Sequence, residues 1–314
     1  MFLGIDIGHS AIKAVVFDDD WNEAVSAHAN ISMYVPKPGY YETSIRELWS
    51  QTKKVLREIT KKVNPNLIKG IGICGGGNGF YPLDENLNPV RRGITLLDLR
   101  AKYIIDQLKK EGKYDILFRK LGMPVLPGAI PVILRWLKDH EYERYRKIKY
   151  ILARKDIIRL KLTGDISTEI TDACFGLLNV ESQEYDRELF EILGVEDMMD
   201  ALPELRPNSY DVAGFITEEA SRETGLNEGT PVVAGAHDAC CNTLGVGAVK
   251  DNIVCAGGGT WSINLLVVDK PLLNPMWSCE CFVKKGTWIL EGSSPTATIS
   301  LDWFVKNFCG DEER

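Results

Sequence analysis

The sequence contains no run of about 18 uninterrupted apolar residues, the length that a membrane-spanning helix needs. A secretory signal peptide is not expected either, because Asp6 interrupts the segment that would have to be apolar. Lysine and arginine (37) are fewer than aspartate and glutamate (44), so the net charge is −7. This charge argues against a nucleic-acid backbone or an anionic membrane as the main partner. We therefore expect a cytoplasmic protein that binds neither nucleic acid nor membrane.

Two common kinds of site also lack their patterns. The eight cysteines form no C-x-x-C pair and the four histidines lie far apart, whereas structural zinc sites have closely spaced paired ligands. The cysteines are better explained as free thiols in a reducing compartment. No Walker A loop, G-x-x-x-x-G-K-[S/T], occurs. If the protein binds a phosphorylated ligand, another kind of loop must hold the phosphates.

The order of the predicted elements indicates a mixed α/β protein. The runs FLGIDIG, AIKAVVFDDD and EAVSAHANISM read as three strands separated by turn-forming residues. Ser44 and Glu47 have the spacing of a capping box and precede apolar residues at helical spacing. The run IKGIGICG then reads as a fourth, buried strand. This β-β-β-α-β order differs from the strict alternation of a simple doubly wound sheet.

The rest of the chain divides into a helical part and a strand-rich part. Residues 100–160 carry charged faces and apolar stripes typical of helices. From about residue 212, strand-like runs lead into glycine- and serine-rich bends. Because 314 residues exceed the usual size of one hydrophobic core, we expect two lobes.

Two glycine hairpins are candidate phosphate loops. GIDIGHSAIK contributes Asp6, Gly8, Ser10 and Lys13, and VCAGGGTWSIN contributes Gly259 and Thr260. Glycine lets the main chain approach a ligand closely, so that several backbone N–H groups and a hydroxyl can bind phosphate oxygens. Asp6 could position a hydrated Mg²⁺ beside them. The alternative is that both segments are simply tight turns.

Asp238 is the candidate general base. It follows the apolar run Val232-Val233-Ala234 in the segment GAHDA, where a carboxylate at the end of a buried strand would face a cleft. Phosphoryl transfer to an alcohol needs an acceptor for the hydroxyl proton, and aspartate has this role in kinases of several folds. The alternative is a helix N-cap, and the two roles are compatible.

Several motifs together resemble the FGGY family of carbohydrate kinases, which belongs to the actin/hexokinase/Hsp70 superfamily. They are GIDIGHSAIK, GICGGGNGFYPLD, DLRA, KDIIRLKLTG, TEITDACFGLLNV, GTPVVAGAHDACCNTLGVG and GGGTW. The first is similar to D-x-G-T-x-x-x-K, with Ser10 taken as the counterpart of the threonine. The motifs occur in the family's order and cover the chain almost from end to end.

The resemblance implies an α/β actin-like ATPase (ribonuclease H-like) fold, with a mixed sheet flanked by helices in two lobes. It implies ATP-dependent phosphorylation of a hydroxyl on a small sugar or polyol, with ATP and Mg²⁺ as cofactors. Asp238 would be the catalytic base and Asp6 the metal-positioning residue. Gly8, Ser10, Lys13, Gly259 and Thr260 would bind the phosphates. The sugar would lie near Gly77, Asn78, Asp98 and Asp238.

Two departures bear on the substrate. Gly76-Gly77-Asn78 replaces the family's Gln-x-His, and Leu96 replaces a tryptophan, which implies a smaller and less aromatic pocket. The segments GGTWSIN and EGSSPTATISLDWF are similar to those of kinases acting on L-xylulose and related ketoses or polyols.

The resemblance also divides the chain. Residues 1–247 would form an N-terminal sugar-binding lobe, and residues 248–314 would begin a nucleotide-binding lobe that stays incomplete. Two alternatives remain open: a catalytically inactive sugar-binding lobe, and a non-kinase actin-like nucleotide-binding protein. A homodimer is also left open.

Overall fold

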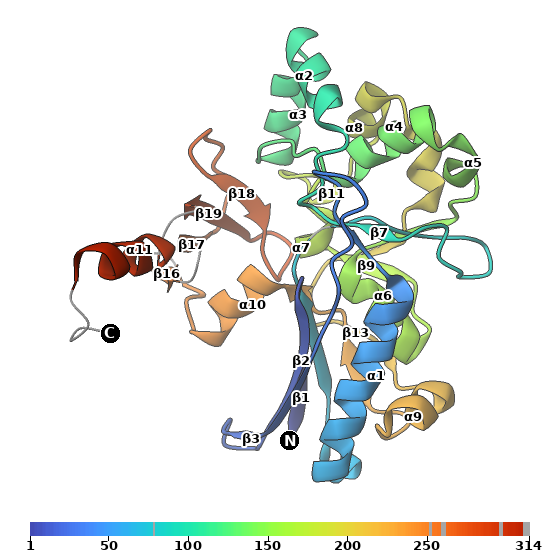
Figure 1. The fold of residues 1–314 in the computed structure, drawn as a ribbon, viewed down its shortest axis with the longest axis vertical. Helices are drawn as coiled ribbons and strands as arrows, with labels where there is room; N and C mark the ends of the chain where they lie inside the picture. The colour runs from blue at the N-terminus through green and yellow to red at the C-terminus, as the bar shows by residue number, and fades with distance from the viewer. Residues whose placement is uncertain (78, 251–252, 259–261, 295–297, 310–314) are drawn as a thin grey trace.

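A mixed seven-stranded sheet is the centre of the N-terminal part in the computed structural model (Figure 1). The structure describes residues 1–77, 79–250, 253–258, 262–294 and 298–309. The strand order is β13-β14-β5-β1-β2-β3, and β15 also pairs with β5. The strands are β1 (Phe2–Ile7), β2 (Ala11–Phe17), β3 (Glu23–Asn30), β5 (Ile71–Gly75), β13 (Val212–Phe215), β14 (Pro231–Val233) and β15 (Ala236–His237). The four strands predicted at the start of the chain are confirmed.

The alternation of side chains gives this sheet two unlike faces. Leu3, Ile5 and Ile7 of β1 are buried on one face, against α1 (Ile45–Lys62) and α6 (Arg154–Thr163). Gly4 and Asp6 lie on the other face, because successive side chains of a strand point to opposite sides. The acidic residue is thereby placed away from the core.

Helix α1 begins where the sequence predicts, but only half of the capping box forms. Ser44 Oγ accepts a hydrogen bond from the Glu47 backbone N–H at 3.2 Å. The Glu47 carboxylate does not return to Ser44; it accepts hydrogen bonds from Ser32 N at 2.9 Å and from the Tyr34 hydroxyl at 3.2 Å. Glu47 therefore ties the segment after β3 to the helix.

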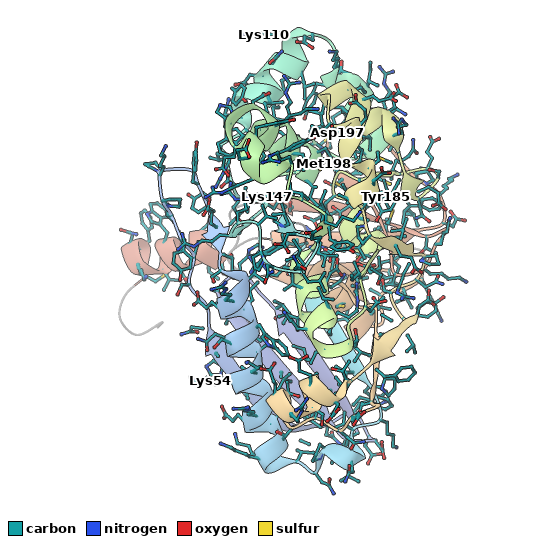
Figure 2. All side chains as sticks on the ribbon, turned by 90° about the vertical axis from the view of Figure 1, so that its right-hand side faces the viewer. Lys54, Lys110, Lys147, Tyr185, Asp197 and Met198 are labelled. Carbon is teal, nitrogen blue, oxygen red and sulfur yellow. The ribbon has the colours of Figure 1, made fainter. Side chains whose placement is uncertain are left out.

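A helical part with its own core lies at one end of the sheet, as predicted for residues 100–160. Lys110 of α2 lies at that end of the molecule, and Lys54 of α1 lies towards the other (Figure 2). The helices here are α2 (Lys102–Lys110), α3 (Tyr114–Leu121), α4 (Ile130–His140), α5 (Tyr142–Tyr145) and α8 (Arg187–Leu193). None of the helices in the described ranges is both long and apolar enough to cross a membrane.

Short strands and helices make up the rest of the fold before residue 246. The paired strands are β4 (Glu42–Thr43) with β7 (Gly93–Ile94), β6 (Tyr81–Leu83) with β8 (Tyr150–Leu152), β9 (Ser167–Glu169) with β12 (Glu204–Arg206), and β10 (Leu178–Asn179) with β11 (Glu184–Tyr185). The short helices are α7 (Ile170–Ala173), α9 (Glu218–Thr224), α10 (Asp238–Gly245) and the 3₁₀ turns Pro65–Leu67 and Glu196–Ala201.

After residue 253 the chain forms a separate antiparallel sheet in the order β16-β17-β19-β18. Its strands are β16 (Val254–Gly258), β17 (Ser262–Val268), β18 (Ser278–Cys281) and β19 (Trp288–Ser294). Strands β16 and β17 confirm the predicted second glycine hairpin, whose turn at 259–261 lies outside the described residues. Helix α11 (Thr298–Phe308) follows.

Candidate active site

The hairpin between β1 and β2 sets Asp6 opposite Lys13. Its turn is tight, because the Gly8 N–H donates to the Ala11 carbonyl oxygen at 3.0 Å. A Cβ on Gly8 would lie 2.9 Å from that oxygen, so the turn requires glycine. Ser10 follows as an exposed residue. The predicted turn between the two strands is confirmed, and binding of phosphate by its backbone stays a prediction.

A buried arginine that the sequence analysis missed supports the hairpin. Arg154, 1% exposed, donates to the Gly8 carbonyl oxygen at 2.5 Å and to the Tyr81 hydroxyl at 2.8 Å. Arginine is seldom fully buried unless its N–H donors are satisfied. Here the donors of Arg154 are satisfied in part by the Gly8 carbonyl oxygen, so the side chain supports the β1–β2 turn. The only sequence signal is its place directly before the K-D motif at Lys155.

Asp238 is the first residue of α10, directly after the short strand β15. The carboxylate is 45% exposed, so a ligand can reach it. Its Oδ1 accepts hydrogen bonds from the Ala239 N–H at 2.7 Å and from His237 Nε2 at 3.0 Å. The predicted helix start is confirmed, although His237 and not Asp238 occupies the N-cap position.

The charges of the two acidic residues are set by their surroundings. Burial would raise the pKa of Asp238, but the hydrogen bond from His237 and its charge hold that pKa below the usual range. Burial and the charge of Asp238 raise the pKa of Asp6. Asp238 is therefore ionised near neutral pH, and its negative charge repels that of the nearby Asp6 carboxylate.

The Asp6 hairpin suits a magnesium ion held through water. Mg²⁺ keeps several of its waters and is usually bound through one or two carboxylates together with substrate phosphates. A cation beside Asp6 would offset the repulsion from Asp238. No cluster of three or more histidine, cysteine or acidic side chains suited to a directly bound metal occurs in the described part of the chain.

Two imidazole rings fill the space next to the loop after β5. A Cβ on Gly76 would lie 2.7 Å from His9 Nε2, and one on Gly77 would overlap the ring of His237 at Cδ2. Counted from Asp6, the D-x-G-T spacing also places His9, and not Ser10, at the threonine. Gly76, at the position of the family's glutamine, and Gly77 beside it therefore leave room for rings from two other segments.

Burial and the nearby charge of Arg154 lower the pKa of His9 to about 4, so this ring is neutral near pH 7. For His237, burial opposes the charged form, but the hydrogen bond and charge of Asp238 outweigh it and raise the pKa to about 9. The two rings thus differ in charge, although both have a buried Nδ1 without a hydrogen-bond partner among the described residues.

Asp98, predicted to contact the sugar, lies in a buried ion pair. It is fully buried, and its carboxylate accepts hydrogen bonds from Tyr41 N at 2.7 Å and from Arg100 Nε at 2.8 Å. The same guanidinium contacts Glu42 at 2.8 Å. These contacts fix the segment around Asp98, and a direct contact with a sugar stays a prediction.

The other predicted residues are divided between described and undescribed positions. Gly77 lies against the ring of His237, the residue before Asp238. Asn78, Gly259 and Thr260 lie outside the described residues.

The K-D and T-D motifs form a buried charge network behind the site. Lys155 Nζ lies 3.0 Å from Glu169 and 2.7 Å from Asp172. Glu169 accepts a hydrogen bond from Thr171 Oγ1 at 2.7 Å, and that hydroxyl oxygen accepts the His237 backbone N–H at 2.8 Å. The network therefore fixes the backbone from which the Asp238 side chain projects.

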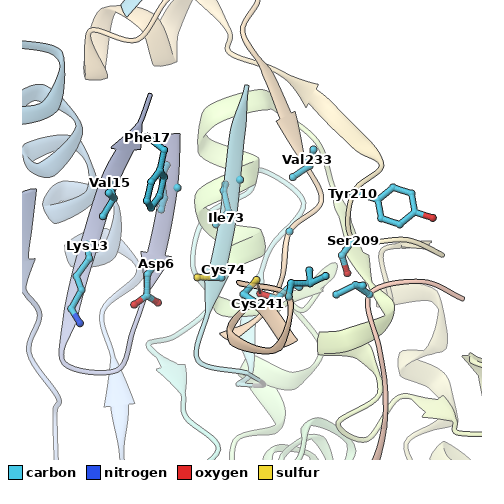
Figure 3. A pocket seen from close by; sticks show the side chains of 17 residues that line it. Asp6, Lys13, Val15, Phe17, Ile73, Cys74, Ser209, Tyr210, Val233 and Cys241 are labelled. Carbon is cyan, nitrogen blue, oxygen red and sulfur yellow. Dashed lines mark hydrogen bonds between the residues drawn. The ribbon is translucent and has the colours of Figure 1, made fainter. Parts of the chain in front are cut away.

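A cavity of about 510 Å³ lies on the open face of the main sheet. Glycines at positions 4 and 72 leave this face flat, and Phe17 and Val233 line it. Figure 3 shows Asp6 and Lys13 at one end of it. Asp238 is not among its lining residues, although its neighbours Ala236 and Cys241 are.

Comparisons with known proteins agree with this arrangement. The model for the N-terminal domain of the FGGY family of carbohydrate kinases matches residues 1–245. A probable L-xylulose kinase of Pasteurella multocida is 35% identical over 98% of this chain and 64% of its own length. The L-xylulose/3-keto-L-gulonate kinase of Escherichia coli is 31% identical over 97% of this chain and 62% of its own.

Solved structures give the same result. A gluconate kinase from Lactobacillus acidophilus superposes with a TM-score of 0.91 at 26% identity, over 99% of this chain and 63% of that one. The ligand-bound xylulose kinase from the same organism gives a TM-score of 0.91 at 25% identity, over 98% and 62%. The expected α/β actin-like ATPase fold is confirmed. The chain spans about 64% of the length of the first relative, and it belongs to the FGGY family of carbohydrate kinases.

Proposed function

We propose that the protein transfers the γ-phosphoryl group of ATP to a hydroxyl of a small sugar or polyol. The observation that carries this proposal is an ionised, accessible carboxylate at Asp238, close to the hairpin that contains Asp6. In this reaction the hydroxyl oxygen forms a bond to the γ-phosphorus as the bond to ADP breaks. The hydroxyl proton passes to Asp238.

The hairpin residues would hold the phosphates. The backbone N–H and the hydroxyl of Ser10 would provide donors, and Lys13 beside Asp6 a positive charge, whereas the Gly8 N–H already donates to the Ala11 carbonyl oxygen. Mg²⁺, held through water by Asp6, would neutralise charge on the transferred group. Gly259 and Thr260 stay predicted phosphate-binding residues.

We infer a ketopentose or a related polyol as the acceptor. Support comes from relatives described as L-xylulose kinases. Residues 1–247 would form the sugar-binding lobe, and residues 248–314 would begin the nucleotide-binding lobe. The separate sheet after residue 253 supports this division. Cytoplasmic location stays a prediction.

A substrate panel tests the proposal. Purified protein is titrated in a calorimeter with L-xylulose, D-xylulose, gluconate and glycerol, with and without Mg-ATP, and ADP release is followed for each. We expect one ketose or polyol to bind and to stimulate ADP release. Binding of a sugar without ADP release would favour the inactive sugar-binding lobe, and sugar-independent ATP hydrolysis would favour a nucleotide-binding protein of another kind.

A further inference from the structure

The hydrogen bonds of Asp238 are all on one side of its carboxylate. Oδ1 accepts from both the Ala239 N–H and His237 Nε2. Oδ2 accepts no hydrogen bond from any residue in the described ranges. A carboxylate held by two donors at one oxygen cannot rotate freely, so the second oxygen keeps a fixed direction.

His237 is itself held in place by two other segments, α7 with the residue Phe175 just after it, and the loop after β5. Its backbone N–H donates to Thr171 Oγ1 at 2.8 Å, which fixes the position of its main chain. The ring of Phe175 lies edge-on at 5.0 Å between centroids. On a further side the ring lies against Gly77, where any Cβ would overlap it. The His237 side chain is only 12% exposed, so packing determines its orientation.

We propose that His237 is a positioning residue for Asp238, and that Gly77 makes room for it. In this arrangement Nε2–H fixes Oδ1 and leaves Oδ2 to receive the proton of the acceptor hydroxyl. The inference rests on the proposed role of Asp238 as the general base. It assigns functional roles to His237 and to the glycine at 77 that go beyond the base itself.

The charged groups around His237 support a protonated ring. Asp238 is its hydrogen-bond partner, and Asp172 on α7 also favours the positive form; burial raises the pKa of Glu280 on β18 to about 8, so Glu280 adds to this effect only as it ionises. His9 faces it from the β1–β2 turn and is neutral near pH 7. Above a pH of about 9 the ring loses its charge, which weakens its hold on the carboxylate.

A first experiment examines the contact without any need for turnover. Protein labelled with ¹⁵N at histidine is titrated by NMR, before and after Asp238→Asn. We expect the His237 ring to stay protonated well above its ordinary range, and to titrate at lower pH in the Asp238→Asn variant. A ring that titrates near 6.5 in both proteins would overturn the pairing, whether or not the protein proves to be a kinase.

A second experiment examines the effect on the reaction. We expect His237→Ala to lower kcat by about 10- to 100-fold, because a small misplacement of a reacting group costs rates of that order. KM for ATP should change little. His237→Gln keeps an N–H near the Nε2 position, so it should recover most of kcat. In the parent protein kcat should fall above a pH of about 9, where the ring loses its charge, and in His237→Gln this fall should be absent. His140→Gln, on α4 against Trp136, is the matched control.

The fit between Gly77 and His237 gives a double-mutant cycle. Gly77→Ala should lower both the melting temperature and kcat, because the new methyl group displaces the ring. In a His237→Ala background the same change should leave the melting temperature unaltered, with kcat still low. Equal losses of stability in the two backgrounds would refute the contact. Full kcat in folded His237→Ala would refute the positioning role.

Discussion

His9 and Gly76 fit together across the two loops of the site: a Cβ at position 76 would stand 2.7 Å from His9 Nε2. His9 follows β1 and Gly76 follows β5, and these strands lie side by side in parallel. The rings of His9 and His237 therefore enter the site from either side of one glycine loop. This places an imidazole next to the hairpin of Asp6 and another next to Asp238.

Asp238→Asn should lower kcat by about 10²- to 10⁴-fold while the protein remains folded, because the amide cannot accept the hydroxyl proton. Sugar affinity should fall less than kcat. Steady-state kinetics and a thermal melt measure both effects. Asp115→Asn on the exposed side of α3 is the control. Activity of the Asp238 variant within about tenfold of the parent would contradict its role as the base.

Asp6→Asn should weaken magnesium binding, so that more magnesium is needed for half-maximal activity. It should not lower the stability of the fold. Burial and the Asp238 charge raise the pKa of Asp6, so its ionised form is disfavoured in the folded protein. A raised carboxyl pKa means that stability is lost as pH rises, and the amide removes this loss. A magnesium titration of activity, together with a thermal melt at pH 7, checks both parts. A clear fall in melting temperature with unchanged magnesium dependence would show that Asp6 only stabilises the turn.

His9 should make the fold less stable in mild acid. Its pKa is lowered from 6.5 to about 4 by burial and by Arg154, so the unfolded chain binds a proton that the folded protein does not. Stability should therefore fall as pH drops from 6.5 towards 4, by up to about 3 kcal/mol for this one group. Urea unfolding at pH 4.5 and 7 measures the fall. It should be smaller in His9→Gln and unchanged in the control His28→Gln, which alters an exposed residue.

Helix α11 should cause this chain to self-associate. Trp303 is 60% exposed, Phe304 51% and Phe308 66%, which places large apolar side chains in water on one short helix. Light scattering should show a mass above that of the monomer, and Phe304→Lys should reduce it. Tyr142→Lys, at an exposed position on α5, is the control. A monodisperse monomer at high concentration would contradict this prediction.

The sequence predicted the elements whose signals are local. Alternating apolar residues gave β1 and β2, and the Ser44 cap gave the start of α1. The strand and helix around Asp238 were also visible, because small and apolar residues surround it. These features depend on neighbours a few residues away.

Contacts between residues far apart in the sequence could not be predicted from local patterns. The match of Gly77 with His237 joins segments 160 positions apart, and neither residue has a local pattern that indicates the other. Arg154 was missed because a basic residue in a helix normally faces water, whereas here it supports Gly8. Asp98 fits a family motif, but only the structure shows that its carboxylate forms a buried ion pair with Arg100.

In the proposed reaction the protein makes a phosphate ester on a sugar, with Asp238 as the base. Phosphorus NMR of the protein with L-xylulose and Mg-ATP follows this reaction directly. We expect a phosphomonoester signal to grow in step with ADP, and to be nearly absent with Asp238→Asn. ADP accompanied only by inorganic phosphate, at the same rate with and without each sugar of the panel, would contradict the account.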